Sequence, residues 1–203
     1  MTSALLAGLG LGLSLIVAIG AQNAYVLQVG VRGRGLGGVV AVCIASDMAL
    51  IIAGVAGLGA AVSGRPLLLE VVKWAGAAVL LGYGLRSLWA ARRSEGLVAG
   101  GDGAASVAAV VTGALALTWL NPHVYLDTVL LLGSASTRYA GDRWWFALGA
   151  VVASVAWFCL LGFGARRLAG VLARPGVWRA INLGIGALLL LLALRLATMP
   201  LGG

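Results

Sequence analysis

The chain has 203 residues, of which 62% are hydrophobic and only 10% are charged. A soluble domain carries roughly 25% charged and 45–50% apolar residues, so this sequence lacks the polar residues that a water-facing surface needs. The net charge of +8 does not indicate nucleic-acid binding, because the arginines stand between long apolar runs rather than in one polar domain. The composition therefore predicts an all-α integral membrane protein that binds no nucleic acid.

Apolar runs along the chain predict six transmembrane helices, since a helix needs about 20 apolar residues to cross the hydrocarbon core. Residues 1–21 lack the positively charged start of a signal peptide, so we expect them to remain part of the first span. In chain order, the predicted spans cover residues 3–29, 37–62, 67–90, 106–133, the stretch between Arg143 and Arg166, and 179–198.

A stretch rich in glycine and alanine, residues 94–105, is the predicted linker between two halves. Each half, residues 1–93 and residues 106–203, would contain three transmembrane helices. Because three is an odd number, the second half enters the membrane from the opposite side. Related halves would then form a 3+3 inverted repeat, as in many transporters.

The distribution of basic residues predicts the orientation in the membrane. The connections after the first, third and fifth spans carry nine arginines, and the opposite side carries five basic residues, two of them within spans. The nine-arginine side is therefore predicted to be cytoplasmic, with both termini outside.

Polar residues within the spans are candidates for a functional site, because a charge at mid-bilayer costs roughly 2.5–3.5 kcal/mol on insertion scales. The first span contains two adjacent amides, Gln22 and Asn23. These amides either line a substrate site or form hydrogen bonds between helices, which contribute about 0.6 kcal/mol on average.

The fourth span contains the second polar group, in the run from Trp119 to Asp127. Pro122 disfavours helical geometry at the preceding residue, so we expect Asn121 to cap a half-helix that starts at Pro122. The amino end of such a half-helix suits a substrate carboxylate. His123 and Asp127 are four residues apart and would share a helix face. The alternative is a proline kink with a buried His–Asp pair.

The second span contains an acid, Asp47, about ten residues from its cytoplasmic end. A lone carboxylate near mid-membrane needs a cationic partner or a proton. A structural salt bridge to Lys73 is the competing explanation.

These motifs resemble the LysE/ArgO family of basic amino-acid exporters, over residues 3 to 198. The family usually has proline where this chain has Ala21, and the run through His123 is closer to the family's arginine exporters than to its lysine exporters. The segments that carry the resemblance are Gly20–Leu27, Ser46-Asp47, Lys73–Gly76, Trp119–Thr128, Asp142–Gly149 and Ile181–Leu183.

The resemblance implies a multi-pass protein of the bacterial inner membrane that exports L-arginine, with L-lysine and basic analogues as further candidates. We expect the polar residues of the spans to line one cavity near mid-membrane, because each is too polar to face lipid. The predicted substrate-binding residues are Gln22, Asn23, Asp47, Asn121, His123, Tyr125 and Asp127.

Export of a cation against an inside-negative potential favours coupling to an inward proton. Asp47 is the predicted site shared by proton and substrate, with Asp127 as the alternative.

Three other functions compete with basic amino-acid export. A neutral amino-acid exporter, as in the related RhtB family, has no need of two acids. A metal-cation exporter would rely on one histidine and two distant cysteines, a poor ligand set. An intramembrane hydrolase would need a nucleophile and a base, and the chain has no Gly-x-Ser-x-Gly elbow. We therefore expect no enzymatic activity, no metal and no cofactor, and homo-oligomerisation is left open.

Overall fold

The computed structural model describes residues 1–17, 20–57, 66–92, 106–121 and 124–198. Every element with defined bounds in these ranges is helical, so the all-α prediction is confirmed there. The first part of the chain forms α1 (Thr2–Ile16), α2 (Ala21–Arg32), α3 (Leu36–Val55) and α5 (Pro66–Arg92). The second part forms α6 (Val107–Trp119), the π-helix η1 (Tyr125–Leu132), α8 (Gly133–Ser136), the 3₁₀-helix η2 (Thr137–Asp142), α9 (Arg143–Arg167), α10 (Ala169–Leu172) and α11 (Pro175–Thr198).

Three helices of the described residues, α3, α9 and α11, are long and apolar enough to cross a membrane. The pair α1 and α2 supplies a fourth span if the bent pair counts as one. The remaining candidates are α5, which carries Lys73 and Arg86 within its length, and the 13-residue α6. A polytopic membrane protein follows from these helices, and the count of six spans stays a prediction.

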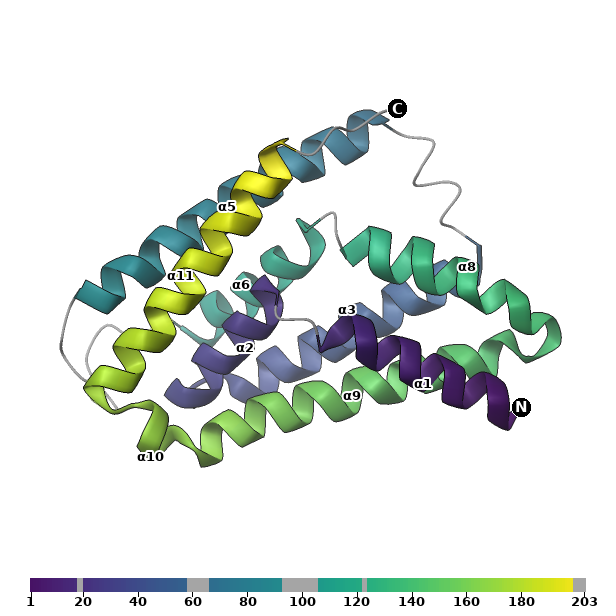
Figure 1. Cartoon of the computed structure of the whole chain (residues 1–203), viewed down its shortest axis with the longest axis horizontal. Coiled ribbons are helices and arrows are strands. Elements are labelled where there is room, and N and C mark those ends of the chain that lie inside the picture. The colour runs from purple at the N-terminus through teal and green to yellow at the C-terminus, as the bar shows by residue number, and fades with distance from the viewer. Residues whose placement is uncertain (18–19, 58–65, 93–105, 122–123, 199–203) are drawn as a thin grey trace.

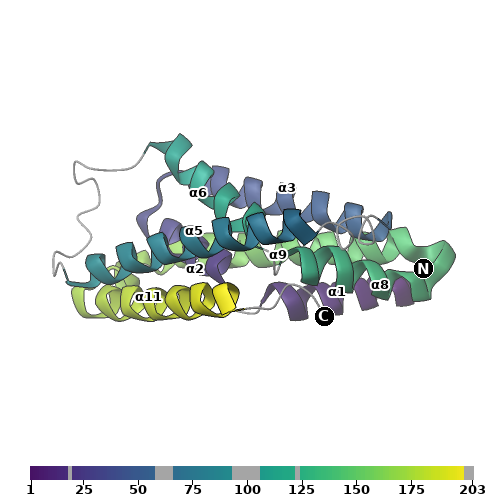
Figure 2. The same ribbon diagram turned by 90° about the horizontal axis from the view of Figure 1, so that it is seen from above.

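The helices pack mainly in two pairs. Figure 1 shows α5 lying along α11 and α1 lying along α9, and both pairs stay adjacent in the view turned by 90° (Figure 2). Helix α3 packs against α9, and both α6 and η1 pack against α3.

Glycine brings α1 and α9 into close contact. A Cβ atom at Gly8 would collide with the Phe146 carbonyl of α9, and a Cβ atom at Gly149 would collide with the Leu5 carbonyl of α1. Helix association in lipid relies on such close packing, because the hydrocarbon surroundings give no hydrophobic driving force.

Two of the predicted spans are broken at their polar motifs. Helix α1 ends at Ile16 and α2 begins at Ala21, with an angle of 78° between them. The backbone of Gly20 is extended, with φ −112° and ψ −175°, so the break occurs although the family's usual proline is absent. In the fourth span, α6 ends at Trp119 and η1 begins at Tyr125.

A buried polar network connects α2 to α5 and α11. The Gln28 amide nitrogen donates to Ser87 Oγ at 3.1 Å and to Asn182 Oδ1 at 3.2 Å. Asn182 in turn donates to the Trp178 carbonyl at 2.8 Å. All three polar side chains are buried, so the network fixes α2 to the α5–α11 pair.

Substitution of Gly149 by alanine tests the close contact between α1 and α9. The added methyl group must push the two helices apart, and overpacking of this kind costs about 1–3 kcal/mol. We expect Gly149→Ala to lower the melting temperature of the purified protein in detergent by several degrees, measured by tryptophan fluorescence. Gly164→Ala, on the same helix, is the matched control, because a Cβ atom at Gly164 would meet nothing within 4 Å. Equal melting temperatures for the two variants would contradict this packing.

Candidate functional site

A cavity of about 220 Å³ lies where the two broken spans meet α3, α9 and α11. This volume is below the roughly 300–1,000 Å³ of pockets for drug-sized ligands, and it suits a ligand the size of an amino acid. The polar residues that line the cavity are Gln22, Asn23, Asp47, Asn121, Asp127, Thr128 and Arg195. Its apolar wall is formed by Leu15, Ile16, Leu80, Val124, Phe158 and Leu192, together with Gly20 and Ala21.

Five of the seven predicted site residues thus line one cavity, namely Gln22, Asn23, Asp47, Asn121 and Asp127. Tyr125 is not among its lining residues. His123, like Pro122, lies outside the described residues, so the predicted cap and the predicted His–Asp pair are not described. The assignment of these residues to substrate stays a prediction.

Asp47 is held by α9. Its side chain is 5% exposed, and its Oδ2 atom accepts a hydrogen bond of 2.7 Å from the fully buried Ser154. The preceding residue, Ser46, accepts a hydrogen bond of 3.0 Å from the Trp119 indole nitrogen at the end of α6. The Ser46-Asp47 pair therefore ties α3 to both α6 and α9 beside the cavity.

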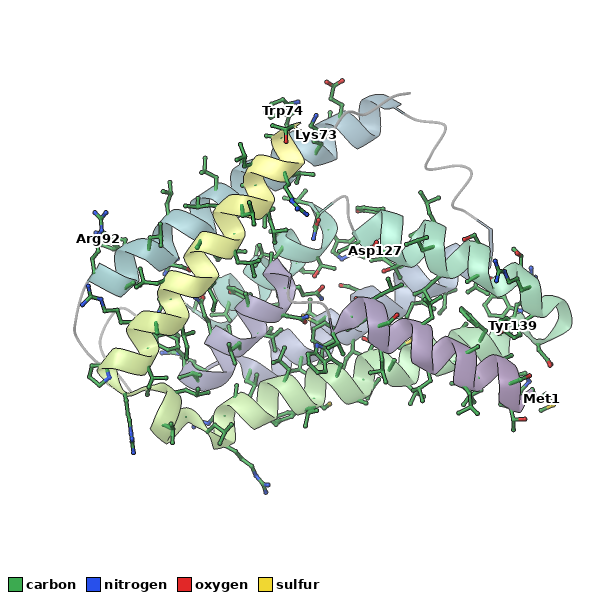
Figure 3. The ribbon with its side chains drawn as sticks, in the orientation of Figure 1. Met1, Lys73, Trp74, Arg92, Asp127 and Tyr139 are labelled. Carbon is green, nitrogen blue, oxygen red and sulfur yellow. The ribbon has the colours of Figure 1, made fainter. Side chains whose placement is uncertain are left out.

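The alternative partner for Asp47, a salt bridge to Lys73, is not formed between these two described residues. Lys73 lies near the start of α5 beside Trp74 (Figure 3), with its Nζ atom 5.3 Å from the centre of the Trp74 ring. Within the described residues, Asp47 is therefore paired with the hydroxyl of Ser154 and not with the ammonium group of Lys73.

Asn23 joins the two parts of the first broken span. Its Nδ2 atom donates to the carbonyl of Ile16, the last residue of α1, at 2.7 Å. Its Oδ1 atom accepts a hydrogen bond of 3.2 Å from the Trp157 indole of α9. Asn23 therefore positions the start of α2 against α1 and α9, in addition to lining the cavity.

Gln22 presents a buried donor to the same region. Its Nε2 atom is buried without a hydrogen-bond partner among the described residues. The Cys43 thiol lies beside the amide, and sulfur is only a weak acceptor. A ligand with a stronger acceptor could satisfy this donor.

The fourth span changes from an α-helix, α6, to a π-helix, η1, across its break. The Tyr125 hydroxyl donates to the Trp119 carbonyl at 2.8 Å, which satisfies a main-chain acceptor at the end of α6. Asp127 follows on η1, near the middle of the molecule (Figure 3). A π-helix has i→i+5 hydrogen bonds and occurs frequently at functional sites.

Three polar residues of the cavity region, Thr128, Ser154 and Arg195, were missing from the predicted site, although Thr128 directly follows the predicted Asp127. Ser154 is a small residue in the fifth span and gave no signal, because its partner is 107 positions away. Arg195 lies in the last turn of α11, and in the sequence it is one of the two basic residues within spans on the side opposite the nine arginines. Its place within an apolar run was the signal that could have identified it.

Metal-binding groups do not gather in the described part of the chain, where no three side chains of His, Cys, Asp or Glu are placed to hold an ion.

Comparisons with known proteins agree with a membrane transport protein. Residues 13–200 match the family described as LysE type translocator. The chain is 38% identical to the lysine exporter LysE of Corynebacterium diphtheriae, over 94% of this chain and 97% of that protein. It is 42% identical to the arginine exporter protein ArgO of Yersinia enterocolitica, over 99% of each chain. A putative amino-acid transporter of Mycobacterium tuberculosis is 45% identical over 84% of this chain and 85% of its own length. No solved structure matches.

Apolar helices that are broken around a cavity with polar and charged lining residues are typical of membrane transport proteins. With the family match over most of its length, the chain belongs to the LysE family of translocators. The named relatives are exporters and transporters, so the prediction that the chain is not an enzyme is confirmed.

Removal of the Ser154 hydroxyl tests its role as the partner of Asp47. A hydrogen bond to a charged group contributes about 1.5–3 kcal/mol, so we expect Ser154→Ala to lower the free energy of unfolding by this amount. The matched control is Ser136→Ala, another buried serine, whose hydroxyl donates only to the Gly133 carbonyl of its own turn. Thermal unfolding in detergent micelles gives both values, and similar losses in the two variants would contradict the assignment.

Proposed function

We propose that the protein exports L-arginine and other basic amino acids from the cytoplasm across the bacterial inner membrane. The single observation that carries this proposal is that Asp47 of α3 and Asp127 of η1 line the same cavity. Two carboxylates in a membrane interior are costly unless they meet cations or protons, and a basic amino acid brings two cationic groups. The names of the relatives LysE and ArgO support the same class of substrate.

The charge of the substrate makes export costly. Moving one positive charge outward against an inside-negative potential costs roughly 2.3 kcal/mol per 100 mV. A tenfold excess of substrate in the cytoplasm offsets only about 1.4 kcal/mol. Strong export therefore needs a coupled ion that moves inward.

A proton is the coupled ion that the cavity favours, because a carboxylate can exchange a proton for a guanidinium group. Asp47 is the proposed exchange site, since it is buried and lies on α3 between α6 and α9. Exchange of one proton inward for one arginine outward would be electroneutral and would be driven by the pH gradient.

A 3+3 inverted repeat is proposed as the architecture behind this exchange. What supports it is the order of elements, since each half contains a broken span followed by two helices. The contacts add further support: α1 packs on α9, α6 packs on α3, and the third helices α5 and α11 pack on each other. The predicted linker, residues 94–105, lies outside the described residues.

Transport by inverted membrane vesicles tests the proposed substrate. Labelled L-arginine should accumulate in vesicles that contain the protein when their lumen is acidified. Unlabelled L-arginine and L-lysine should reduce this accumulation, whereas L-leucine should not, because it offers no second cation to the two acids. Competition by L-leucine as strong as that by L-lysine would show a neutral amino-acid exporter instead.

The role of Asp47 in coupling is tested by Asp47→Asn in the same vesicles. The amide keeps the shape of the side chain but cannot exchange a proton, so we expect a folded protein without pH-driven accumulation of arginine. Asp142→Asn is the control, because Asp142 pairs with the Met1 ammonium group away from the cavity. Accumulation by Asp47→Asn at the wild-type rate would exclude Asp47, and Asp127→Asn would then be measured as the alternative.

The proposed orientation, with both termini outside, is tested by fusing a reporter that is active only in the cytoplasm. A fusion after Gly203 should be silent, and an insertion within residues 94–105 should be active, because the basic residues retain that side in the cytoplasm. A strong signal from the fusion after Gly203 would overturn the orientation or the span count.

A further inference from the structure

A cation lines the cavity beside the two acids. Arg195 projects from the last turn of α11, and Leu192, one turn earlier, lines the same cavity. Its guanidinium group forms no ion pair with a carboxylate in the described ranges, and its side chain remains accessible. A cation in a cavity that accepts a basic amino acid needs an explanation, because it repels the substrate's cationic groups.

The start of α2 contributes further donors to this cavity. The first hydrogen bond within α2 is donated by Ala24 to the Gly20 carbonyl at 3.0 Å. The N–H groups of Ala21 and Gln22, which precede Ala24, therefore have no acceptor within their own helix. No side chain caps this end, and the buried Gln22 Nε2 atom is a further donor without a hydrogen-bond partner among the described residues. Neutral donors and a guanidinium group around one cavity are typical of a carboxylate-binding site.

The charges of the cavity also match those of a basic amino acid group by group. The substrate has one anionic group, the α-carboxylate, and two cationic groups, the α-ammonium and the side-chain cation. The cavity has one cation, Arg195, and two acids, Asp47 and Asp127, among its described lining residues.

We propose that Arg195, together with Gln22 and the amino end of α2, binds the α-carboxylate of the transported amino acid. This inference rests on the proposed function and adds the residue that requires the substrate to be an α-amino acid rather than any small dication. Asp47 and Asp127 then take the two cationic groups. The planar guanidinium group matches a carboxylate with two parallel hydrogen bonds, which a lysine at the same position cannot reproduce.

Binding of two ligands to the purified full-length protein tests this assignment. L-arginine has the carboxylate, and L-argininamide replaces it with a neutral amide of nearly the same shape. Isothermal titration of wild type should show tighter binding of L-arginine. In Arg195→Gln, the affinity for L-arginine should fall roughly 10- to 100-fold, as expected for a lost charge-assisted hydrogen bond. The affinity for L-argininamide should stay the same or rise, because a repelling cation has been removed.

Control variants separate substrate binding from folding. Arg195→Lys keeps the charge but not the fork geometry, so its loss of arginine affinity should be intermediate. Arg179→Gln removes an exposed cation near the other end of the same helix and should change neither affinity. Melting temperatures of all variants are compared without ligand.

The outcomes distinguish this inference from the proposed function. Equal losses for both ligands in Arg195→Gln, or equal affinities of wild type for both ligands, would overturn the carboxylate site. If wild type instead binds L-leucine and not L-arginine, and Arg195→Gln abolishes that binding, the carboxylate site stands and the proposed substrate class falls.

Discussion

Main-chain groups exposed by two broken helices need partners, because hydrocarbon offers none. At the first break, the Asn23 amide takes the carbonyl of Ile16. At the second, the Tyr125 hydroxyl takes the carbonyl of Trp119. Irregular backbone at membrane depth is tolerated only within protein or beside a cavity, and both breaks in this protein border the same cavity. Polar side chains of both motifs thus form hydrogen bonds with main-chain carbonyls at the two breaks, and the cavity lies at the same breaks.

The cavity depends on α9, whose apolar sequence gave no indication of a role in the site. Helix α9 supplies Ser154 to Asp47 and Trp157 to Asn23. Both contacts require α9 to pass beside α3 and the start of α2, and the glycine contacts with α1 hold it in register. The fifth span is therefore the support on which polar residues of the other spans are positioned.

The apolar runs predicted the long helices α3, α9 and α11. Five of the polar lining residues could be predicted too, because a charge or an amide is conspicuous in a run of leucine, valine and alanine. Ser154 could not be predicted, since a serine is compatible with any face of a membrane helix and only the fold shows what it contacts. Arg195 entered only the count of basic residues for the orientation, since an arginine near the end of a span usually extends its charge to the interface. The sequence also allowed a salt bridge between Lys73 and Asp47, because pairing residues by charge alone takes no account of where α5 lies relative to α3.

The Gln28 network has a mechanical consequence. It fastens α2 to α5 and α11, and α2 also packs along α9, as α1 does. Helix α2 therefore connects the two helix pairs. A shift of the α5–α11 pair relative to α9 would have to be taken up by α2, whose first turn lies at the cavity. Arg195 lies on α11 itself. The same shift would therefore move Arg195 and the donors at the start of α2 together, and the hydrogen bonds to a bound carboxylate would all change at once.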